Sequence, residues 1–358
     1  MSTTAGGSGS PIRVAVIGFG AAGMYFHSPF VAATPGLRLT TIVTSDAARA
    51  AQAQSEYPEV TIRAKAAELW TAGDVDLVIV AAPNVAHVPL AMAAIEAGIP
   101  VVVDKPLAVT SAEARRLVAF ARDRNVPLAV YQNRRFDGDF QTMSALVREG
   151  TIGDPLRFES RFERWRLQPR EGWRESGDPS QGGGLLMDLG SHLIDQATHL
   201  FGPVASVYAE VDRRRPGVAV DDDVFVALTH ESGVRSHLWM SVLASQGGPR
   251  FRLLGSRASY VKFGMDPQED ALRDGRRPAT DPGWGTEAPD RWGTVGAADD
   301  LRRVETAAGN YTRFYAGVEA SLRTGAPMPV DPEDACRTLE LIEAARRSAE
   351  IGQVVTIG

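Results

Sequence analysis

The stretch IRVAVIGFGAAGMYFHSPF, residues Ile12–Phe30, decides the fold of the first part of the chain. Its first six residues are mostly apolar and β-branched, which predicts a buried strand, and GFGAAG then predicts a glycine turn leading into a helix. Gly18 permits the tight turn, Gly20 lets the backbone approach a pyrophosphate, and Gly23 lets the helix pack closely on the strand. Free N–H groups at the helix start favour a bound phosphate, so the stretch predicts dinucleotide binding. The predicted cofactor contacts here are Gly18, Phe19, Gly20, Ala21, Ala22 and Gly23.

Length, charge and composition limit the classes of protein to consider. The 358 residues are enough for two domains, and the net charge of −6 comes without any basic block, so we expect no nucleic-acid or membrane partner. Residues 1–10 have neither a basic nor an apolar signal region and predict a disordered tail. No apolar run approaches the roughly 20 residues that span a bilayer. We expect a cytoplasmic protein whose single cysteine, Cys336, lies in the core.

Strand and helix patterns alternate from residue 11 to residue 131. Further strands are predicted at 37–44, 60–63, 75–82, 99–103 and 126–131, and further helices at 46–56, 64–70, 85–97 and 111–124. This alternation with short loops predicts a doubly wound parallel sheet covered on both faces. In the strand order 3-2-1-4-5-6, strands 4 and 5 lie on the nicotinamide side of the sheet. The residues that follow those two strands should therefore face the chemistry.

The end of the second strand is where such a fold recognises the adenosine ribose. The chain has Thr44, Ser45 and Asp46 there, with Arg49 one turn further on. Asp46 is either the acid that binds the ribose 2′-hydroxyl or the N-cap of the following helix. We favour NADP over NAD, with Ser45 and Arg49 near the 2′-phosphate and Thr44 as a further cofactor contact.

Polar residues follow the fourth and fifth strands. Pro83 and Asn84 come after the fourth strand, and Asn84 is either a cofactor contact or a helix N-cap. Lys105 follows the fifth strand and is one of three lysines in a chain rich in arginine, with Lys65 and Lys262. A lysine at the end of a buried strand has few structural reasons to be there, so we assign it a functional role. His87, on the following helix, is interpreted as a packing residue.

The second half of the chain begins after a linker at 132–137, whose Arg134 and Arg135 either touch the cofactor or form ion pairs. Strands are predicted at 155–165, 203–213, 222–230, 234–242, 249–254, 257–262 and 354–357, and helices at 140–149, 185–201, 311–323 and 332–351. This pattern predicts an open antiparallel or mixed sheet with one face on helices. The other face is a natural interface for a homodimer or homotetramer. The segment 265–302 is rich in Gly, Pro and charge, and we expect a long excursion.

A polar stripe runs along the helix at 185–201. Asp188, His192, Asp195 and His199 share one face at helical spacing, after the glycine run 182–184. Three interpretations of this stripe are open: a solvated helix face, a metal site or an acid–base pair. A solvated face more usually has Lys, Arg and Glu, and a metal would need ligands from a second cluster, which the sequence does not show. We favour Asp188 and His192 as an acid–base pair, with His192 titrating near neutrality, and we expect no metal.

Four motifs together resemble the Gfo/Idh/MocA (glucose–fructose oxidoreductase/inositol dehydrogenase) family. They are Gly18–Gly23, Pro83-Asn84, Asp104-Lys105-Pro106 and Gly182–His192, and the resemblance extends from residue 11 to the C-terminus. Within the family, four more segments are similar to the branch of NADP-dependent scyllo-inositol dehydrogenases: Phe26–Pro29, Val103–Thr110, Asn133–Phe140 and Gly264–Glu269. The resemblance implies an α/β protein with an NAD(P)-binding Rossmann domain at 11–131. It also implies a C-terminal α/β domain at 132–358, with a large open sheet, for substrate binding and oligomerisation.

The resemblance also implies roles for individual residues. Lys105 matches the lysine that contacts the reacting hydroxyl and the nicotinamide ribose. Asp188 and His192 match an aspartate–histidine pair in which the histidine is the base. Asn84 matches a nicotinamide-side contact, and Ser45 stands where NAD-preferring relatives have an acid. Asp104 replaces the family's commoner glutamate, a change that we expect to be harmless.

The expected activity is hydride transfer between NADP(H) and a secondary hydroxyl or ketone of a cyclic polyol or sugar. The expected substrate contacts are Lys105, Arg166, Trp173, Arg174, Asp188 and His192, with the segment 310–315. One alternative is a non-catalytic NADP(H) sensor, which would have no use for Lys105, Asp188 and His192 together. Another is an enzyme that uses bound NAD(P) only transiently, for elimination or glycoside cleavage.

Overall fold

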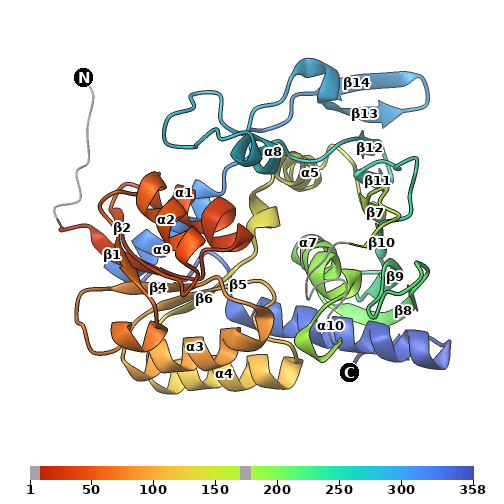
Figure 1. Cartoon of the computed structure of the whole chain (residues 1–358). Helices are drawn as coiled ribbons and strands as arrows, with labels where there is room; N and C mark the ends of the chain where they lie inside the picture. Colours follow the sequence, from red (N-terminus) through yellow and green to blue (C-terminus); the bar gives the residue numbers. More distant parts are fainter. Residues whose placement is uncertain (1–8, 170–178) are drawn as a thin grey trace.

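Two β-sheets form the framework of the molecule (Figure 1). The computed structural model describes residues 9–169 and 179–358. The first sheet, drawn from red to orange-yellow, lies beside helices on both of its faces, and the second stands at the opposite side of the molecule.

The first sheet has six parallel strands in the order β3-β2-β1-β4-β5-β6. Their bounds are β1 Ile12–Ile17, β2 Leu37–Val43, β3 Thr61–Arg63, β4 Leu77–Val80, β5 Val101–Asp104 and β6 Leu128–Tyr131. The central strands are buried on both faces because helices cover them, as the continuous apolar runs indicate. The predicted doubly wound sheet is confirmed, and all six strands end at one edge.

The helices of this half follow the predicted alternation. They are α1 Ser28–Ala32, α2 Ala47–Glu56, α3 Asn84–Glu96 and α4 Ser111–Asp123. Two details differ from the prediction. The helix after the glycine turn begins as a π-helix at Ala22–His27, a form frequent at functional sites. The predicted helix at 64–70 is only a 3-10 turn at Ala66–Leu69.

The second sheet has nine strands in the order β14-β13-β12-β11-β7-β10-β9-β8-β15. Their bounds are β7 Pro155–Glu163, β8 Val204–Asp212, β9 Asp223–His230, β10 Arg235–Ser241, β11 Phe251–Gly255, β12 Ser259–Lys262, β13 Gly293–Ala297, β14 Asp300–Val304 and β15 Val355–Thr356. Only β7 and β10 pair in parallel among these strands of the described chain, so the sheet is mixed, as expected.

The expectation of a long excursion at 265–302 is wrong in part. The segment contains α8 Gln268–Arg273 and β13, and the hairpin of β13 and β14 adds two strands to the edge of the sheet. Side chains of β14 are almost all exposed, so no apolar alternation marks this strand in the sequence.

One face of the first sheet shares a hydrophobic core with the second sheet, and a separate core cluster lies on its other face. A single cluster of buried side chains includes Val80 and Val103 of the first sheet and Met240 and Leu253 of the second. Four further helices lie between or around the sheets: α5 Gly138–Arg148, α7 Ser191–Phe201, α9 Thr312–Thr324 and α10 Pro332–Ile351. The long α10 contacts α4, α7 and β8, and in Figure 1 it runs below both sheets. Cys336 on α10 is a buried free thiol, as predicted.

Candidate active site

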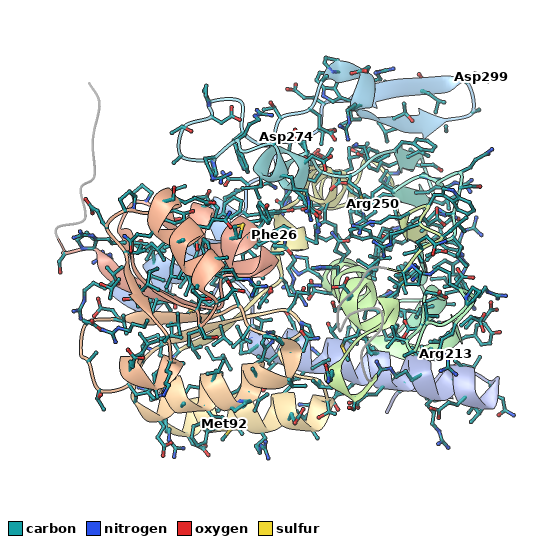
Figure 2. The ribbon with its side chains drawn as sticks, in the orientation of Figure 1. Phe26, Met92, Arg213, Arg250, Asp274 and Asp299 are labelled. Carbon is teal, nitrogen blue, oxygen red and sulfur yellow. The ribbon has the colours of Figure 1, made fainter. Side chains whose placement is uncertain are left out.

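A cavity of about 300 Å³ lies between the two halves of the chain. The ends of β5 and β6 and the π-helix after β1 line one side, and β7 with the segment before α7 lines the other. Phe26, labelled in Figure 2, is part of its wall on the side of the first sheet. Six of the predicted site residues line this cavity: Ala21, Ala22, Lys105, Arg166, Asp188 and His192.

The glycine turn after β1 has the backbone that a dinucleotide requires. Gly18 has a φ of +96°, and a Cβ there would lie 2.5 Å from the Ala81 carbonyl oxygen. A Cβ on Gly23 would lie 2.0 Å from the carbonyl oxygen of Gly18, so helix and turn pack too closely for any side chain. A Cβ on Gly20 would meet only Arg49 Nη1, at 3.8 Å. The space over Gly20 is thus open for a pyrophosphate, and the residues present fit a bound dinucleotide.

The end of β2 resolves the two interpretations of Asp46. Its side chain accepts hydrogen bonds from the backbone N–H groups of Ala48, at 2.9 Å, and Arg49, at 3.0 Å. Asp46 is therefore the N-cap of α2. Thr44 Oγ1 accepts the N–H of Asp46 and shapes the same turn. Arg49 is half exposed and its guanidinium reaches the open space beside Gly20.

Lys105 stands at the end of β5 and reaches across to the second half of the chain. Its Nζ donates to Asp188 Oδ1 at 2.9 Å and to the backbone oxygen of Asp188 at 2.7 Å. The next peptide bond, Lys105–Pro106, is cis. His87 supports this turn from behind, with its ring nitrogens 2.8 Å from the carbonyl oxygens of Pro106 and Ala82. His87 is thus a packing residue, as predicted.

The predicted pairing of Asp188 with His192 differs from the observed contacts. Residues Leu186–Gly190 form a π-helix before α7, which changes the spacing that an α-helix would give. Asp188 accepts from Lys105, while His192 Nδ1 is buried and has no hydrogen-bond partner within the described ranges 9–169 and 179–358. His192 lines the cavity and is 5% exposed.

His192 also titrates differently from the prediction. Burial lowers the pKa of His192 well below its usual value, and the positive charges of Lys105, Arg134 and Arg250 lower it further. The expectation of titration near neutrality is wrong for this state of the protein. The imidazole is instead neutral at pH 7 and able to accept a proton.

The other half of the polar stripe is structural. Asp195 accepts from Arg135 Nε at 2.8 Å and Nη2 at 2.6 Å, and both side chains are buried. Arg135 also pairs with Asp334 on α10. His199 lies near the Phe140 ring, 6.1 Å between centroids. Asp195 therefore anchors α7 to the linker, the exposed His199 lies at the surface of the helix, and neither lines the cavity.

Both linker arginines form ion pairs, one of the two alternatives that the sequence left open, and Arg134 also lines the cavity. Arg134 donates to Glu269 at 2.6 Å and to the Tyr311 hydroxyl at 3.1 Å, and lies 3.5 Å from Asp137. With the pairs of Arg135, these contacts connect the linker to α7, α8, α9 and α10. They fix the cavity wall.

Asn84 does not cap α3. The helix begins at Asn84 itself, after Pro83, and the amide Nδ2 donates to the carbonyl oxygen of Gly182 at 3.1 Å. Asn84 thereby joins the end of β4 to the glycine run of the second half. Of the remaining substrate contacts, Trp173 and Arg174 lie outside the described residues. Tyr311 and Tyr315, from the segment 310–315, are fully buried behind the cavity wall.

Several residues of the cavity wall were not predicted. Tyr131, the last residue of β6, and Asp104 both lie where the strand-end rule looks for ligands, so that signal could have found them. Phe162 and Arg164 come from the region of β7, where alternation alone marks no functional residue. Among the described residues, no cluster of His, Cys, Asp or Glu could hold a metal ion, and no helix is long and apolar enough to cross a membrane.

Comparisons with known proteins match almost the whole chain. The family model described as an oxidoreductase family, NAD-binding Rossmann fold (Gfo/Idh/MocA), matches residues 12–132. The model of the same family's C-terminal alpha/beta domain matches residues 144–357.

Individual relatives agree with the family models. The Escherichia coli oxidoreductase YdgJ is 40% identical over 95% of this chain and 96% of its own. The scyllo-inositol 2-dehydrogenase (NADP(+)) IolW of Bacillus subtilis is 33% identical over 95% of this chain and 94% of its own. The solved structure of the oxidoreductase yvaA from Bacillus subtilis has a TM-score of 0.90 at 31% identity and covers 98% of this chain and 100% of its own. With this glycine turn, this pair of sheets and these matches, the chain belongs to the Gfo/Idh/MocA oxidoreductase family.

Proposed function

We propose that the protein is an NADP(H)-dependent dehydrogenase for a secondary hydroxyl or ketone of a cyclic polyol or sugar. One observation supports this most: Lys105 and neutral His192 line the same cavity, at the end of the sheet where the strand order puts the nicotinamide. The relative IolW, which is named an NADP(+)-dependent scyllo-inositol dehydrogenase, makes scyllo-inositol and scyllo-inosose the first candidate pair.

The side chains suit the oxidation of an alcohol. A nicotinamide held at this end of the sheet would supply the acceptor for the hydride from the substrate carbon. His192, neutral at pH 7, takes the hydroxyl proton as general base. The Lys105 ammonium donates to the same oxygen and stabilises the negative charge that develops there. Asp188 holds that ammonium in place through its carboxylate and its carbonyl oxygen. Ketone reduction is the reverse.

The preference for NADP is supported by the end of β2. Asp46 uses Oδ1 of its carboxylate to cap α2, which accounts for an acid at this position without a ribose contact. Ser45 follows β2 where an acid would favour NAD, and Arg49 offers a cation beside the glycine turn. NAD remains the alternative cofactor.

The test is a titration of the purified protein with NADPH and with NADH, followed by addition of scyllo-inosose. Tighter binding of NADPH and oxidation of NADPH by scyllo-inosose support the full proposal. Turnover of another keto-sugar or aldose from a panel instead keeps the dehydrogenase and changes the substrate. Binding without turnover of any ketone or sugar would contradict catalysis and support the NADP(H)-sensing alternative.

We also propose a homodimer or homotetramer formed through the second sheet. Helices α7 and α10 pack against this sheet (Figure 1). The half-buried Phe225, His237 and Trp239 of β9 and β10 alternate with the buried residues of these strands and so lie on the opposite face. The Phe225 and Trp239 rings lie 5.2 Å apart, and Arg161 stacks 3.9 Å from the Trp239 ring centre. Light scattering tests the assembly: Trp239→Glu should give monomers, and a wild-type monomer would contradict it.

A further inference from the structure

Asp104, next to the active-site lysine, is a charged residue of the cavity wall to which the proposed mechanism gives no role. It is the last residue of β5, lines the cavity and has a side chain 14% exposed. Its Oδ1 accepts the backbone N–H of Lys105 at 2.9 Å and lies 3.6 Å from Nε2 of His27. The carboxylate therefore faces the same space as the Lys105 side chain.

No lysine or arginine within the described residues pairs with the Asp104 carboxylate. The ammonium of its neighbour, Lys105, binds Asp188 instead. The one ion-pair partner that the described chain gives Asp104 is His27, which is fully buried in the π-helix after the glycine turn. Unlike an arginine, a histidine is not a fixed cation.

Uncharged groups hold His27 from behind. Its Nδ1 lies 2.5 Å from the Tyr315 hydroxyl, and the Tyr131 ring packs on it at 4.5 Å between centroids. The Nε2 atom of the same ring faces Asp104 Oδ1. His27 is a positioning residue that fixes where the Asp104 carboxylate lies.

The carboxylate is an anion at neutral pH. Burial raises the pKa of Asp104, but the hydrogen bond to His27 and the positive charge at His27 and Lys105 outweigh burial and hold the pKa below its usual value. The groups that face it are His27, Lys105, His87, Tyr131 and Tyr315. A carboxylate that lines the cavity without a paired lysine or arginine attracts a ligand that brings positive charge.

We infer that Asp104 biases the site toward the oxidised cofactor. An oxidised nicotinamide ring is a cation and the reduced ring is neutral, so a carboxylate at the nicotinamide end of the sheet attracts the first and not the second. The strand order puts the end of β5 at that end. This inference rests on the proposed function, because it requires that a nicotinamide binds here.

The test measures dissociation constants of NADP⁺ and NADPH by calorimetry, without substrate, for the wild type and three variants. Asp104→Asn keeps the shape of the side chain and removes its charge. This variant should raise the ratio of the NADP⁺ dissociation constant to the NADPH dissociation constant about tenfold. A change of this size is expected when a partly buried cation loses a neighbouring unit of negative charge. Asp104→Glu keeps the charge and should leave the ratio within about threefold of wild type.

Asp221→Asn is the matched control, because Asp221 also lines the cavity but is bound by the backbone N–H of Leu186 on the opposite wall. Its ratio should stay at the wild-type value. A folded Asp104→Asn variant with an unchanged ratio would overturn the inference and leave the proposed function standing. Failure of the wild type to bind either nucleotide would overturn both. A melting curve for each variant establishes that it is folded.

Discussion

The Lys105 ammonium joins the two halves of the molecule by binding both the side-chain carboxylate and the backbone carbonyl oxygen of Asp188. The two residues are 83 positions apart in the sequence. Lys105 follows the carboxyl end of β5, and Asp188 lies in the π-helix before α7. The cavity is therefore complete only when the two halves pack together. The proposed chemistry depends on this contact.

Removing the Lys105 charge should slow catalysis more than it weakens cofactor binding. Lys105→Met keeps the length of the side chain and removes the donor to the reacting oxygen. We expect kcat to fall by about 10²–10³, as when one oxyanion donor is lost. Steady-state kinetics and an NADPH titration measure the two effects. A kcat within about threefold of wild type would contradict the role of Lys105.

His192→Ala should lower kcat by about 10²–10⁴, the usual contribution of a general base. The NADPH dissociation constant should stay near the wild-type value. His199→Gln is the matched control, since His199 lies on the same helix α7 but does not line the cavity. Equal kcat values for the two variants would exclude His192 as the base.

The pH dependence of alcohol oxidation should reflect the depressed pKa of His192. Burial and the charges of Lys105, Arg134 and Arg250 disfavour the protonated ring, so the neutral base persists as the pH falls through 6.5. We expect protonation of His192 to reduce kcat/KM only below pH 6.5. A pH profile with a midpoint at or above 6.5 that disappears in His192→Ala would contradict this.

The preference for NADPH should depend on Arg49. Arg49→Ala removes the guanidinium beside Gly20 and should raise the dissociation constant of NADPH about tenfold, with little change for NADH. Arg38→Ala is the control, because it removes an exposed arginine from β2, the strand before the helix that contains Arg49. Equal losses for both nucleotides in Arg49→Ala would mean that this arginine does not recognise the 2′-phosphate.

The buried pair of Arg135 and Asp195 should matter for stability. Arg135→Met leaves the Asp195 carboxylate buried without its cation, so we expect the free energy of unfolding to fall by about 3–5 kcal/mol. Urea denaturation measures the change. Arg122→Met, which removes an exposed partner of Glu333, should change it by no more than about 1 kcal/mol. Similar effects of both variants would show that burial of the Arg135 pair is not decisive.

Local patterns were sufficient for the first sheet. The glycine turn, the alternating elements and the strand-end rule together predicted the strand order and the position of Lys105, because each depends on neighbours in the sequence. They also predicted His87 as a packing residue. Asp46 was left open because a carboxylate before a helix suits both a cap and a ribose contact.

Contacts between distant segments could not be predicted in the same way. The spacing of Asp188 and His192 fits an α-helix, but the π-helical turn and the distant Lys105 decide where the carboxylate binds. The low pKa of His192 results first from burial and then from the charges of Lys105, Arg134 and Arg250, which three other segments bring close. The hairpin of β13 and β14 was missed because its exposed strand has no apolar pattern.

Deuterium tracing tests the central claim, direct hydride transfer at the Lys105–His192 site, most directly. The wild type is given NADPH with deuterium at the transferable ring position and a ketone that it reduces, scyllo-inosose first. We predict deuterium on the new carbinol carbon, with one NADP⁺ formed for each alcohol. A product without deuterium, or turnover without net oxidation of NADPH, would contradict the account and support an enzyme that uses its cofactor only transiently.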